Sequence, residues 1–324
     1  MKFKNFPKKL DSIKKLDTIG EQKKLGIELI SMQKEYALFL GCTIQIRLPN
    51  IESTSKLVLN KFGIKIHEMD GVSCCPEPYT TGLISRELRL ALGARNIAIG
   101  DAMGLDIMCI CNGCYETLFE VKNALNENID AKNKINKLLL PLNKEFKGVN
   151  QVKHVVEVLF EEVGLERIKS QIIKSLSMLN VALHAGCHLY KAINIEESDK
   201  KPKMFEEIVK ATGANLVNYG LEKMCCGYPQ RQVSERISLL ETLAIKLKGI
   251  VDSKADCIVV VCPGCHIQLE FGQIELKHKY KIAFQIPVIH LMELLAIAMG
   301  IPYEKLGLEI RRVPIKDLLK KLEG

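Results

Sequence analysis

Residues 257–265 read CIVVVCPGC, and residues 106–114 read DIMCICNGC. Each segment is a short apolar run that ends in a CxxC motif, and the two motifs lie 151 residues apart. A short apolar run beside turn residues is typical of a buried strand. The sequence therefore predicts two strands, each delivering a pair of cysteines at its carboxyl end.

The similarity between these two regions continues toward the N-terminus. The doublet Cys74-Cys75 recurs as Cys225-Cys226, again at an offset of 151 residues. YALFLGC at 36–42 recurs as VALHAGC at 181–187, but with an offset of 145 residues. A six-residue insertion in the second copy explains the change in offset. A repeat this long indicates a duplicated domain.

The repeat also continues past the CxxC motifs. Residues 152–159 resemble residues 288–295, and both stretches contain a His-x-x-Glu pattern. The offset is only 136 residues here, so the first copy carries about fifteen extra residues, which the Asn- and Lys-rich segment 126–150 supplies. The repeated unit is thus larger than its cysteine motifs.

Each half alternates predicted strands and helices, which favours an α/β fold with a parallel sheet covered by helices. The predicted strands are 36–40, 64–69, 107–110, 181–184, 215–219, 257–261 and 287–289, and the predicted helices are 51–62, 85–103, 114–125, 203–211, 232–249, 265–271 and 291–299. We therefore expect two pseudo-symmetric Rossmann-like domains. Ligands of such sheets bind outside the carboxyl ends of the strands, so the cysteines of each half are expected to converge there.

The domain boundaries follow from the repeat. The first domain is predicted at 36–165, a helical connector at 166–180 and the second domain at 181–324. Residues 1–35 lie outside the repeat and form a basic N-terminal extension. Because Met32 stands just before the first strand, this extension is interpreted as a dispensable tail or as the product of a start site assigned too early.

Length and composition set limits on the class of protein. The chain has 324 residues, of which 47% are hydrophobic, enough for two domains with cores of their own. It shows no apolar run of about 18 residues and no apolar signal core, which predicts a cytoplasmic protein without a membrane span. The net charge of +8 fits anionic substrates, an acidic partner or simply a lysine-coated surface. Without tryptophan, nothing indicates nucleic-acid binding.

Twelve cysteines in a cytosolic chain indicate metal binding or redox chemistry rather than disulfides. Ten of them form two five-cysteine sets of matched spacing, Cys42, Cys74, Cys75, Cys111 and Cys114, and Cys187, Cys225, Cys226, Cys262 and Cys265. A tetrahedral zinc site or an ordinary [4Fe–4S] cubane takes four ligands. Neither explains a fifth cysteine or a pair of adjacent ones, which can ligate different irons of an extended cluster. The pattern favours an enlarged iron–sulfur site in each half, with zinc in one half as the alternative.

The remaining cysteines and the histidines have separate interpretations. Cys109 and Cys257 fall outside the repeat and are expected to be structural. His154 and His290 each begin a predicted helix, where they pack or cap it or else act near a cluster.

His188 and His266 adjoin predicted ligand cysteines and are candidate proton donors to a departing thiolate. His184, on the other side of Cys187, has no histidine counterpart in the first half.

The doubled cysteine pattern resembles the tandem cysteine-rich CCG domains, whose name matches the triplet Cys225-Cys226-Gly227; the first copy departs from it at Pro76. Over about residues 36–303 the chain most resembles the disulfide-cleaving B subunit of the heterodisulfide reductases of methanogenic archaea. That resemblance implies two noncubane [4Fe–4S] clusters, each ligated by five cysteines between the domains. It also implies reduction of the mixed disulfide of coenzyme M and coenzyme B.

The resemblance implies partners as well. In this family a cubane-bearing iron–sulfur subunit delivers the electrons and a flavin-bearing, electron-bifurcating subunit supplies them, with a hydrogenase or formate dehydrogenase as a further partner. The chain has no CxxCxxCxxxCP run of its own, so its electrons are expected from such a partner.

A duplicated site also suits the reaction. Cleaving a disulfide takes two electrons and releases two thiolates, so two facing clusters can supply one electron each and hold one sulfur each. Lysines, arginines and helix N-termini around the cleft would suit the sulfonate, phosphate and carboxylate groups of the substrate.

Two alternatives remain at this point. One is a CCG-domain subunit of another oxidoreductase, of the lactate or glycolate, glycerol-3-phosphate or thiol:fumarate type. The other is a zinc-stabilised scaffold with no enzymatic activity.

Overall fold

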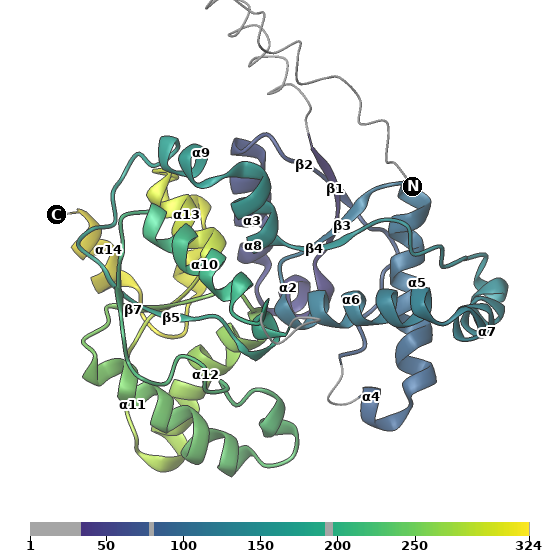
Figure 1. Cartoon of the computed structure of the whole chain (residues 1–324). Coiled ribbons are helices and arrows are strands. Elements are labelled where there is room, and N and C mark those ends of the chain that lie inside the picture. The colour runs from purple at the N-terminus through teal and green to yellow at the C-terminus, as the bar shows by residue number, and fades with distance from the viewer. Residues whose placement is uncertain (1–33, 78–80, 192–196, 324) are drawn as a thin grey trace, which may run out of the picture.

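The computed structural model describes residues 34–77, 81–191 and 197–323, and it contains two four-stranded parallel sheets of identical strand order (Figure 1). The first sheet has the order β2-β1-β3-β4, and its strands are β1 (Glu35–Phe39), β2 (Lys65–Glu68), β3 (Asp106–Cys109) and β4 (Val152–His154). The second has the order β6-β5-β7-β8, with β5 (Asn180–His184), β6 (Asn215–Val217), β7 (Cys257–Val260) and β8 (Val288–His290). The predicted pair of Rossmann-like α/β units is confirmed.

Helices connect the strands, as parallel pairing requires. The α-helices of the first half are α2 (Gly41–Arg47), α3 (Pro49–Lys61), α4 (Thr81–Ile84), α5 (Arg86–Met103), α6 (Asn112–Glu127), α7 (Ile129–Leu139), α8 (Val155–Glu157) and α9 (Leu165–Ser170). Those of the second half are α10 (Lys200–Ala211), α11 (Ala244–Asp252), α12 (Pro263–Tyr280), α13 (Leu291–Ala298) and α14 (Lys316–Glu323). Two π-helical segments, η3 (Val158–Val163) and η7 (Ile237–Leu243), continue α8 and precede α11, and short 3-10 turns are η2 (Leu140–Leu142), η4 (Cys187–Tyr190), η6 (Pro229–Gln232), η8 (Tyr303–Lys305) and η9 (Leu308–Ile310).

The central strands are buried on both faces, because helices cover both sides of each sheet. In β1 the side chains alternate: Tyr36 and Leu38 belong to one apolar cluster, while Ala37 and Phe39 belong to another. The second sheet repeats this division. Each sheet therefore has one face toward a core of its own and one face toward a core shared by both halves.

The shared core arises from an exchange of helices between the halves. Helix α3, which follows the first strand of the first half, packs against α13 of the second half. Helix α10 packs reciprocally against α8, η3 and α9 of the first half. Residues such as Ile51 and Leu295 belong to one continuous cluster, and Asn50 donates a hydrogen bond to Glu293 across the junction at 2.6 Å. The halves are thus joined by a common interior, and the carboxyl ends of their sheets meet.

Two segments differ from the sequence expectations. The predicted helical connector is helical only as far as Ser170. Beyond it, Ile173 and Lys174 donate their backbone N–H groups to the carbonyl of Ala298, and Leu176 donates to Thr212, so the chain bonds to other elements instead of continuing a helix.

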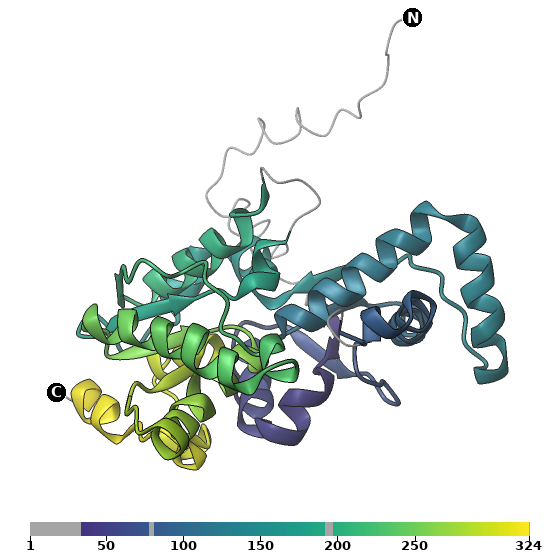
Figure 2. The same cartoon turned by 90° about the horizontal axis from the view of Figure 1, so that it is seen from below.

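The extra segment 126–150 of the first half, in which no helix or strand was predicted, is structured. It contains α7, which packs on α5 and α6, and the side chain of Phe146, after α7, is fully buried. Figure 2 shows this helical projection extending from the first half, away from the second.

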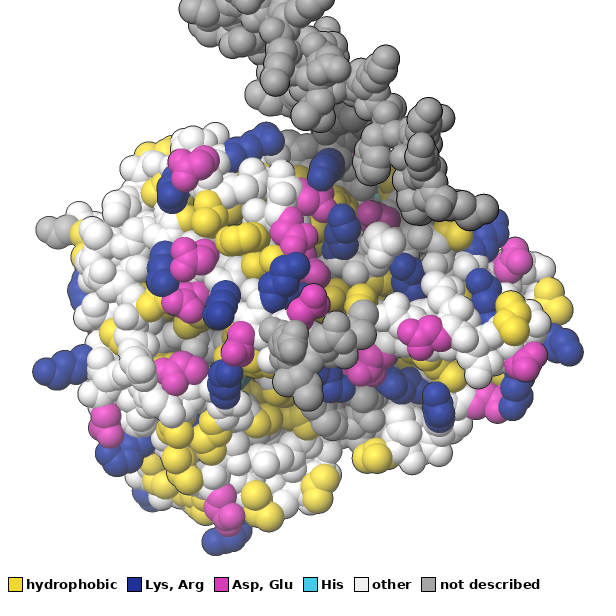
Figure 3. Space-filling view, viewed as in Figure 1, with side chains coloured by type: hydrophobic (Ala, Val, Ile, Leu, Met, Phe, Trp, Pro, Cys, Tyr) yellow, Lys and Arg dark blue, Asp and Glu magenta, His cyan; other side chains and the backbone are white. Residues whose placement is uncertain are grey.

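The domain boundaries themselves stay a prediction, and all but the last two residues of the proposed N-terminal extension lie outside the described residues. Within the described part of the chain, none of the helices combines the length and apolar character needed to cross a bilayer. Among the described residues on the face seen in Figure 3, basic and acidic side chains are interspersed.

Candidate iron–sulfur site

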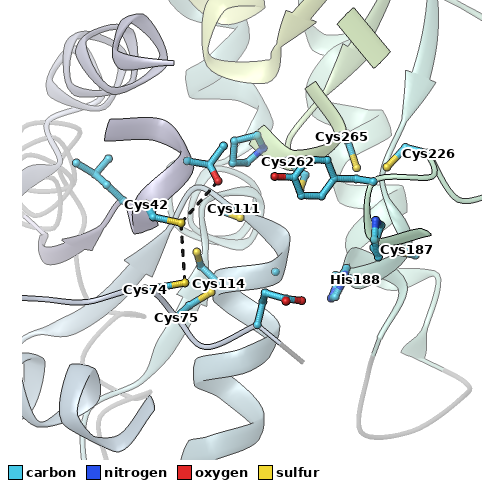
Figure 4. A pocket seen from close by; sticks show the side chains of 18 of the residues that line it. Cys42, Cys74, Cys75, Cys111, Cys114, Cys187, His188, Cys226, Cys262 and Cys265 are labelled. Carbon is cyan, nitrogen blue, oxygen red and sulfur yellow. Dashed lines mark hydrogen bonds between the residues drawn. The ribbon is translucent and has the colours of Figure 1, made fainter. Parts of the chain in front are cut away.

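The ten predicted cysteines come together around one cavity of about 280 Å³ at the junction of the two halves. Figure 4 shows cysteines of both halves facing this space. All of the ten except Cys225 line it directly. They arrive there because each follows the carboxyl end of a strand, and the ends of parallel strands meet at one edge of a sheet.

The CxxC motifs lie at helix N-termini. Cys111 and Cys262 are the N-cap residues of α6 and α12, which places Cys114 and Cys265 at the third helical position. This spacing turns both sulfurs of a motif toward the helix end. The partial positive charge there stabilises thiolates and other anions, so the position of each motif suits metal-bound sulfur.

The thiols of each half form a continuous series of contacts. In the first half the order is Cys42, Cys74, Cys75, Cys114 and Cys111, and in the second it is Cys187, Cys225, Cys226, Cys265 and Cys262. The Sγ atoms of Cys42 and Cys74 are 3.9 Å apart. A contact between Cys111 and Cys262 joins the two series. The structure therefore keeps the repeat symmetry at the level of the sulfur atoms.

Crowded thiols share their protons unequally. Hydrogen bonds from Cys187 and Cys226 lower the pKa of Cys225 to about 2, which leaves it as a thiolate. A hydrogen bond with Cys74 and, to a smaller extent, burial raise the pKa of Cys42. Soft thiolates packed this closely are suitable ligands for iron–sulfur clusters, since cluster binding replaces the protons that the crowded thiols otherwise retain. The cysteines at this site therefore fit iron–sulfur clusters.

In each half, one glycine directly before the first cysteine makes this packing possible. These two glycines were not among the site residues predicted from the sequence. Gly41 and Gly186 have φ of +67° and +79°, a region that L side chains rarely adopt. A Cβ at Gly41 would lie 2.6 Å from Sγ of Cys114, and one at Gly186 would lie 3.2 Å from Sγ of Cys265. The signal was present, because the Gly-Cys dipeptide occurs in both copies of the repeat.

His188 lies where the sequence predicted a functional histidine. It follows Cys187 on η4 and lines the cavity, and its Nδ1 contacts the carboxylate of the buried Glu116 of α6, which forms an ion pair with the ring when the ring is protonated. Glu116 also pairs with Lys191. Burial lowers the pKa of His188, and the neighbouring Cys262 acts in the opposite direction. Glu116 was not predicted from the sequence, since only the fold brings α6 beside η4.

His266 occupies a different environment. It is fully buried and is not among the described residues that line the cavity. Arg311 donates to its Nε2 at 2.5 Å, and the carboxylate of Glu270 lies 3.2 Å from the same nitrogen. Arg311 also pairs with Glu293. These contacts form a buried polar network that ties the C-terminal segment to α12 and α13, and they give a proton-donating role of His266 no support.

His154 and His290 cap the helices that they precede. Nδ1 of each accepts a backbone hydrogen bond from the residue two positions on, at 3.2 Å and 3.3 Å, and the carboxylates of Glu157 and Glu293 accept from the histidine N–H at 2.8 Å. This is a capping box with histidine in the place of serine or threonine. The capping interpretation accounts for the repeated His-x-x-Glu pattern.

The remaining cysteines are confirmed as buried. Cys109 ends β3 and Cys257 begins β7, and neither exposes any surface. Neither is among the residues lining the cavity, in keeping with a structural role.

Comparison with known proteins agrees with this site. The model of the CCG cysteine-rich domain matches residues 36–119 and again residues 181–270. A solved structure of a hypothetical protein from Helicobacter pylori shares the fold, with a TM-score of 0.68 and 18% identity over 92% of this chain and 58% of the other. Two matches at equivalent positions define a tandem cysteine-rich iron–sulfur protein.

Relatives specify the family. The chain is 38% identical over 88% of its length to the B subunit of the ferredoxin/F(420)H(2)-dependent CoB-CoM heterodisulfide reductase of Methanosarcina acetivorans, covering 96% of that protein. It is 33% identical over 86% of its length to the 8-methylmenaquinol:fumarate reductase membrane anchor subunit of Wolinella succinogenes, again covering 96%. The chain belongs to the family of heterodisulfide reductase B subunits, and it is an iron–sulfur component of an oxidoreductase.

Proposed function

We propose that this chain is the catalytic subunit of a heterodisulfide reductase, and that it reduces the mixed disulfide of coenzyme M and coenzyme B to two thiols. The observation that carries the proposal is the arrangement of ten cysteines as two matched sets around one cavity. A disulfide presents two sulfur atoms and needs two electrons, so a paired site suits it better than a single one.

Each set of five cysteines would hold one noncubane [4Fe–4S] cluster. Cys42, Cys74, Cys75, Cys111 and Cys114 would ligate the first, and Cys187, Cys225, Cys226, Cys262 and Cys265 the second. The clusters, when bound, supply electrons one at a time. Five ligands in a contact series that includes adjacent cysteines support this cluster type over a four-ligand cubane or zinc site.

The chain itself would supply protons and position the substrate. His188 lines the cavity and its Nδ1 pairs with Glu116, so the carboxylate orients the ring and balances a charge on it. In this arrangement His188 hands a proton to a departing thiolate, and Glu116 with Lys191 forms the route by which it is replaced. Tyr228 and Gln232, which also line the cavity, offer hydrogen bonds to the polar groups of the substrate.

Electrons would come from partner subunits. We propose a cubane-bearing iron–sulfur subunit as the direct donor and a flavin-bearing, electron-bifurcating subunit behind it, with a hydrogenase or formate dehydrogenase as a further source, all in the cytoplasm. The need for a donor is supported by the sequence, which lacks a cubane-type cysteine run, and by the two remaining cysteines, which are buried in strands.

The test is an anaerobic assay of coenzyme M–coenzyme B disulfide reduction with reduced viologen, on protein whose iron, sulfide and zinc have been measured. We expect about eight irons and eight sulfides per chain and dye-linked activity. H188Q is expected to retain both clusters while kcat falls and its dependence on pH changes. Protein with one zinc per half and no sulfide, or a fully loaded protein that is inactive with this disulfide, contradicts the proposal.

A second function is favoured by one relative. The identity to the fumarate reductase subunit of Wolinella succinogenes is close to that of the methanogen proteins. In that case the paired site would exchange electrons with a quinol instead of a disulfide. A loaded chain that oxidises a menaquinol analogue and ignores the heterodisulfide would decide for this alternative.

A further inference from the structure

The last residue of the first strand differs between the two halves. Phe39 ends β1 and His184 ends β5, and each lies three residues before the first cysteine of its set. Phe39 is fully buried in the apolar cluster that contains Cys75 and Cys114. His184 lies beside Cys226 and Cys265, which are the counterparts of those two cysteines in the repeat. An imidazole thus replaces a phenyl ring at the same place against the cysteine set.

His184 has no partner of its own in the described part of the chain. Its side chain is 1% exposed, and neither Nδ1 nor Nε2 makes a hydrogen bond. An unsatisfied buried polar group is destabilising and is rare in folded proteins. A ring nitrogen of His184 and the sulfurs of Cys226 and Cys265 all lie within 4.8 Å of one another. The missing partner is therefore expected among atoms that these cysteines hold.

A buried lysine also lies near the second cysteine set. Lys246 is fully buried, and its Nζ donates to the carbonyl of Leu221 at 2.5 Å and to Tyr219 Oη at 3.3 Å. Burial lowers the pKa of Lys246 to about 8, and the neighbouring Cys226 and Cys265 act in the opposite direction.

At the repeat offset, Arg95 takes the place of Lys246 in the first half. Its guanidinium donates to the carbonyl of Gly71 at 2.8 Å, and this hydrogen bond is exposed. The basic side chain at this position is thus buried in the second half, whereas its hydrogen bond is exposed in the first.

We propose that His184 donates its ring N–H to a sulfur of the cluster held by the second half, and that this cluster is reduced more readily than the first. The inference rests on the two clusters of the proposed function. Hydrogen bonds to cluster sulfurs stabilise the more negative, reduced form, and a low dielectric strengthens them. The phenyl ring of Phe39 offers no donor, so the first cluster lacks this stabilisation.

A direct iron–nitrogen bond is the competing role for the same imidazole. The first half speaks against it, because five cysteines complete its set although Phe39 cannot ligate. The second half holds the same five cysteines at the same CC-to-CxxC spacing. A hydrogen bond leaves the ligand sets of the halves equal and changes only the potential.

The test is a redox titration followed by electron paramagnetic resonance on anaerobic holoprotein, with viologen as the electron source. H184F installs the residue of the first half, F39H makes the reciprocal change and H184Q keeps a donor. Variants with one cysteine set disabled, C75S and C226S, assign each signal to its half. In H184F we expect the potential of the second cluster to fall by the equivalent of at least tenfold in its reduction equilibrium, 59 mV for one electron. In F39H the potential of the first cluster is expected to rise, and H184Q is expected to resemble the wild type.

The possible results distinguish failure of this inference from failure of the proposed function. An unchanged second potential in fully loaded H184F overturns the inference and leaves the proposed function intact. Pulsed resonance with 15N-histidine that detects a directly bound nitrogen overturns it in favour of ligation, as does loss of the second cluster from H184F, H184L and H184Q alike. Loss of the second cluster from H184F and H184L, with its retention in H184Q, supports a hydrogen-bond donor at position 184. Wild-type protein without iron and sulfide would refute the proposed function itself.

Discussion

The two halves agree in the elements that hold cysteines and differ in what surrounds them. Strand order, the CC-to-CxxC spacing, the glycine before the first cysteine and the histidine capping box all occur twice. The helical projection around α7 belongs to the first half alone, whereas the second places His184 and Lys246 against its cysteines. The arrangement of the cysteines is thus the same in both halves, whereas the polar groups around each cysteine set differ.

The charged interiors of the halves differ in the same way. In the first half, Glu162 accepts hydrogen bonds from Lys34, Lys153 and Tyr36 near the surface. In the second, the side chain of Arg311 is buried between Glu293 and Glu270. Burial of paired charges makes removal of one partner more costly, so the second half is expected to respond more strongly to charge removal.

Disabling one cysteine set is expected to have the largest effect. C75S and C226S, changes at equivalent positions, should each lower the iron and sulfide content by half. Each should also reduce disulfide reduction by about 100-fold or more, since loss of a supporting residue alone costs 10–100-fold at metal sites. Metal analysis and the viologen assay measure both. Full activity in either variant would show that only one half takes part in the reaction.

Removing Arg311 is expected to have the largest effect on stability. R311M leaves Glu293 and Glu270 buried without their cation and should lower the free energy of unfolding by about 3–5 kcal/mol. The matched change K201M removes the cation 3.5 Å from Glu157, the counterpart of Glu293, and its partly exposed pair should cost about 1 kcal/mol or less. Urea unfolding of anaerobic holoprotein, followed by circular dichroism, compares them. Equal losses would refute the contrast between the halves.

Glu162 provides a pH-dependent test in the first half. Burial alone would raise its pKa, but hydrogen bonds from Lys153, Lys34 and Tyr36 outweigh it and lower the pKa below 4.5. The stabilisation is therefore present above pH 4.5 and is lost as the pH falls through the folded-state pKa. E162Q should unfold more easily by about 1–3 kcal/mol at pH 7, with a difference that shrinks in acid. E166Q, at an exposed ion pair, is the control, and a difference independent of pH would exclude this explanation.

The smallest expected effect concerns the histidine caps. H154N and H290N keep a capping side chain, and each should be about 1 kcal/mol more stable than the corresponding alanine variant. Thermal unfolding at neutral pH suffices to measure this. Because both histidines form the same capping box, the two pairs should agree, and a clear difference would show that one histidine has a further role.

Much of the fold was predictable because the repeat is visible in the sequence. The apolar runs at 36–40, 107–110 and 257–261 predicted strands, and ten cysteines at matched spacing predicted a common site, because parallel strands end at one edge. Burial of Cys109 and Cys257 followed from their places in the predicted strands 107–110 and 257–261.

Other features depend on contacts between distant segments. The apolar stripe of α3 shows that one face is buried, but nothing in its sequence specifies α13 as its neighbour. Likewise, nothing in the sequence specifies Glu116 as the neighbour of His188. Nor does the sequence specify the partners of Arg311, which lies outside the repeat. The π-helix at Ile237–Leu243 shifts hydrogen bonds within an apolar stretch that also fits an α-helix.

The exchange of α3 and α13 between the halves also determines the order of folding. A ribosome releases α3 long before α13, and long-range contacts of this kind form slowly. Helix α3 also contacts α2 and β2 of its own half, but the part of its apolar face that α13 covers stays exposed until the last quarter of the polypeptide is synthesised. A nascent chain must keep this face protected, and loading of either cysteine set into its final geometry follows completion of translation. A gene divided between the two halves is accordingly expected to yield fragments that fold only when they are produced together.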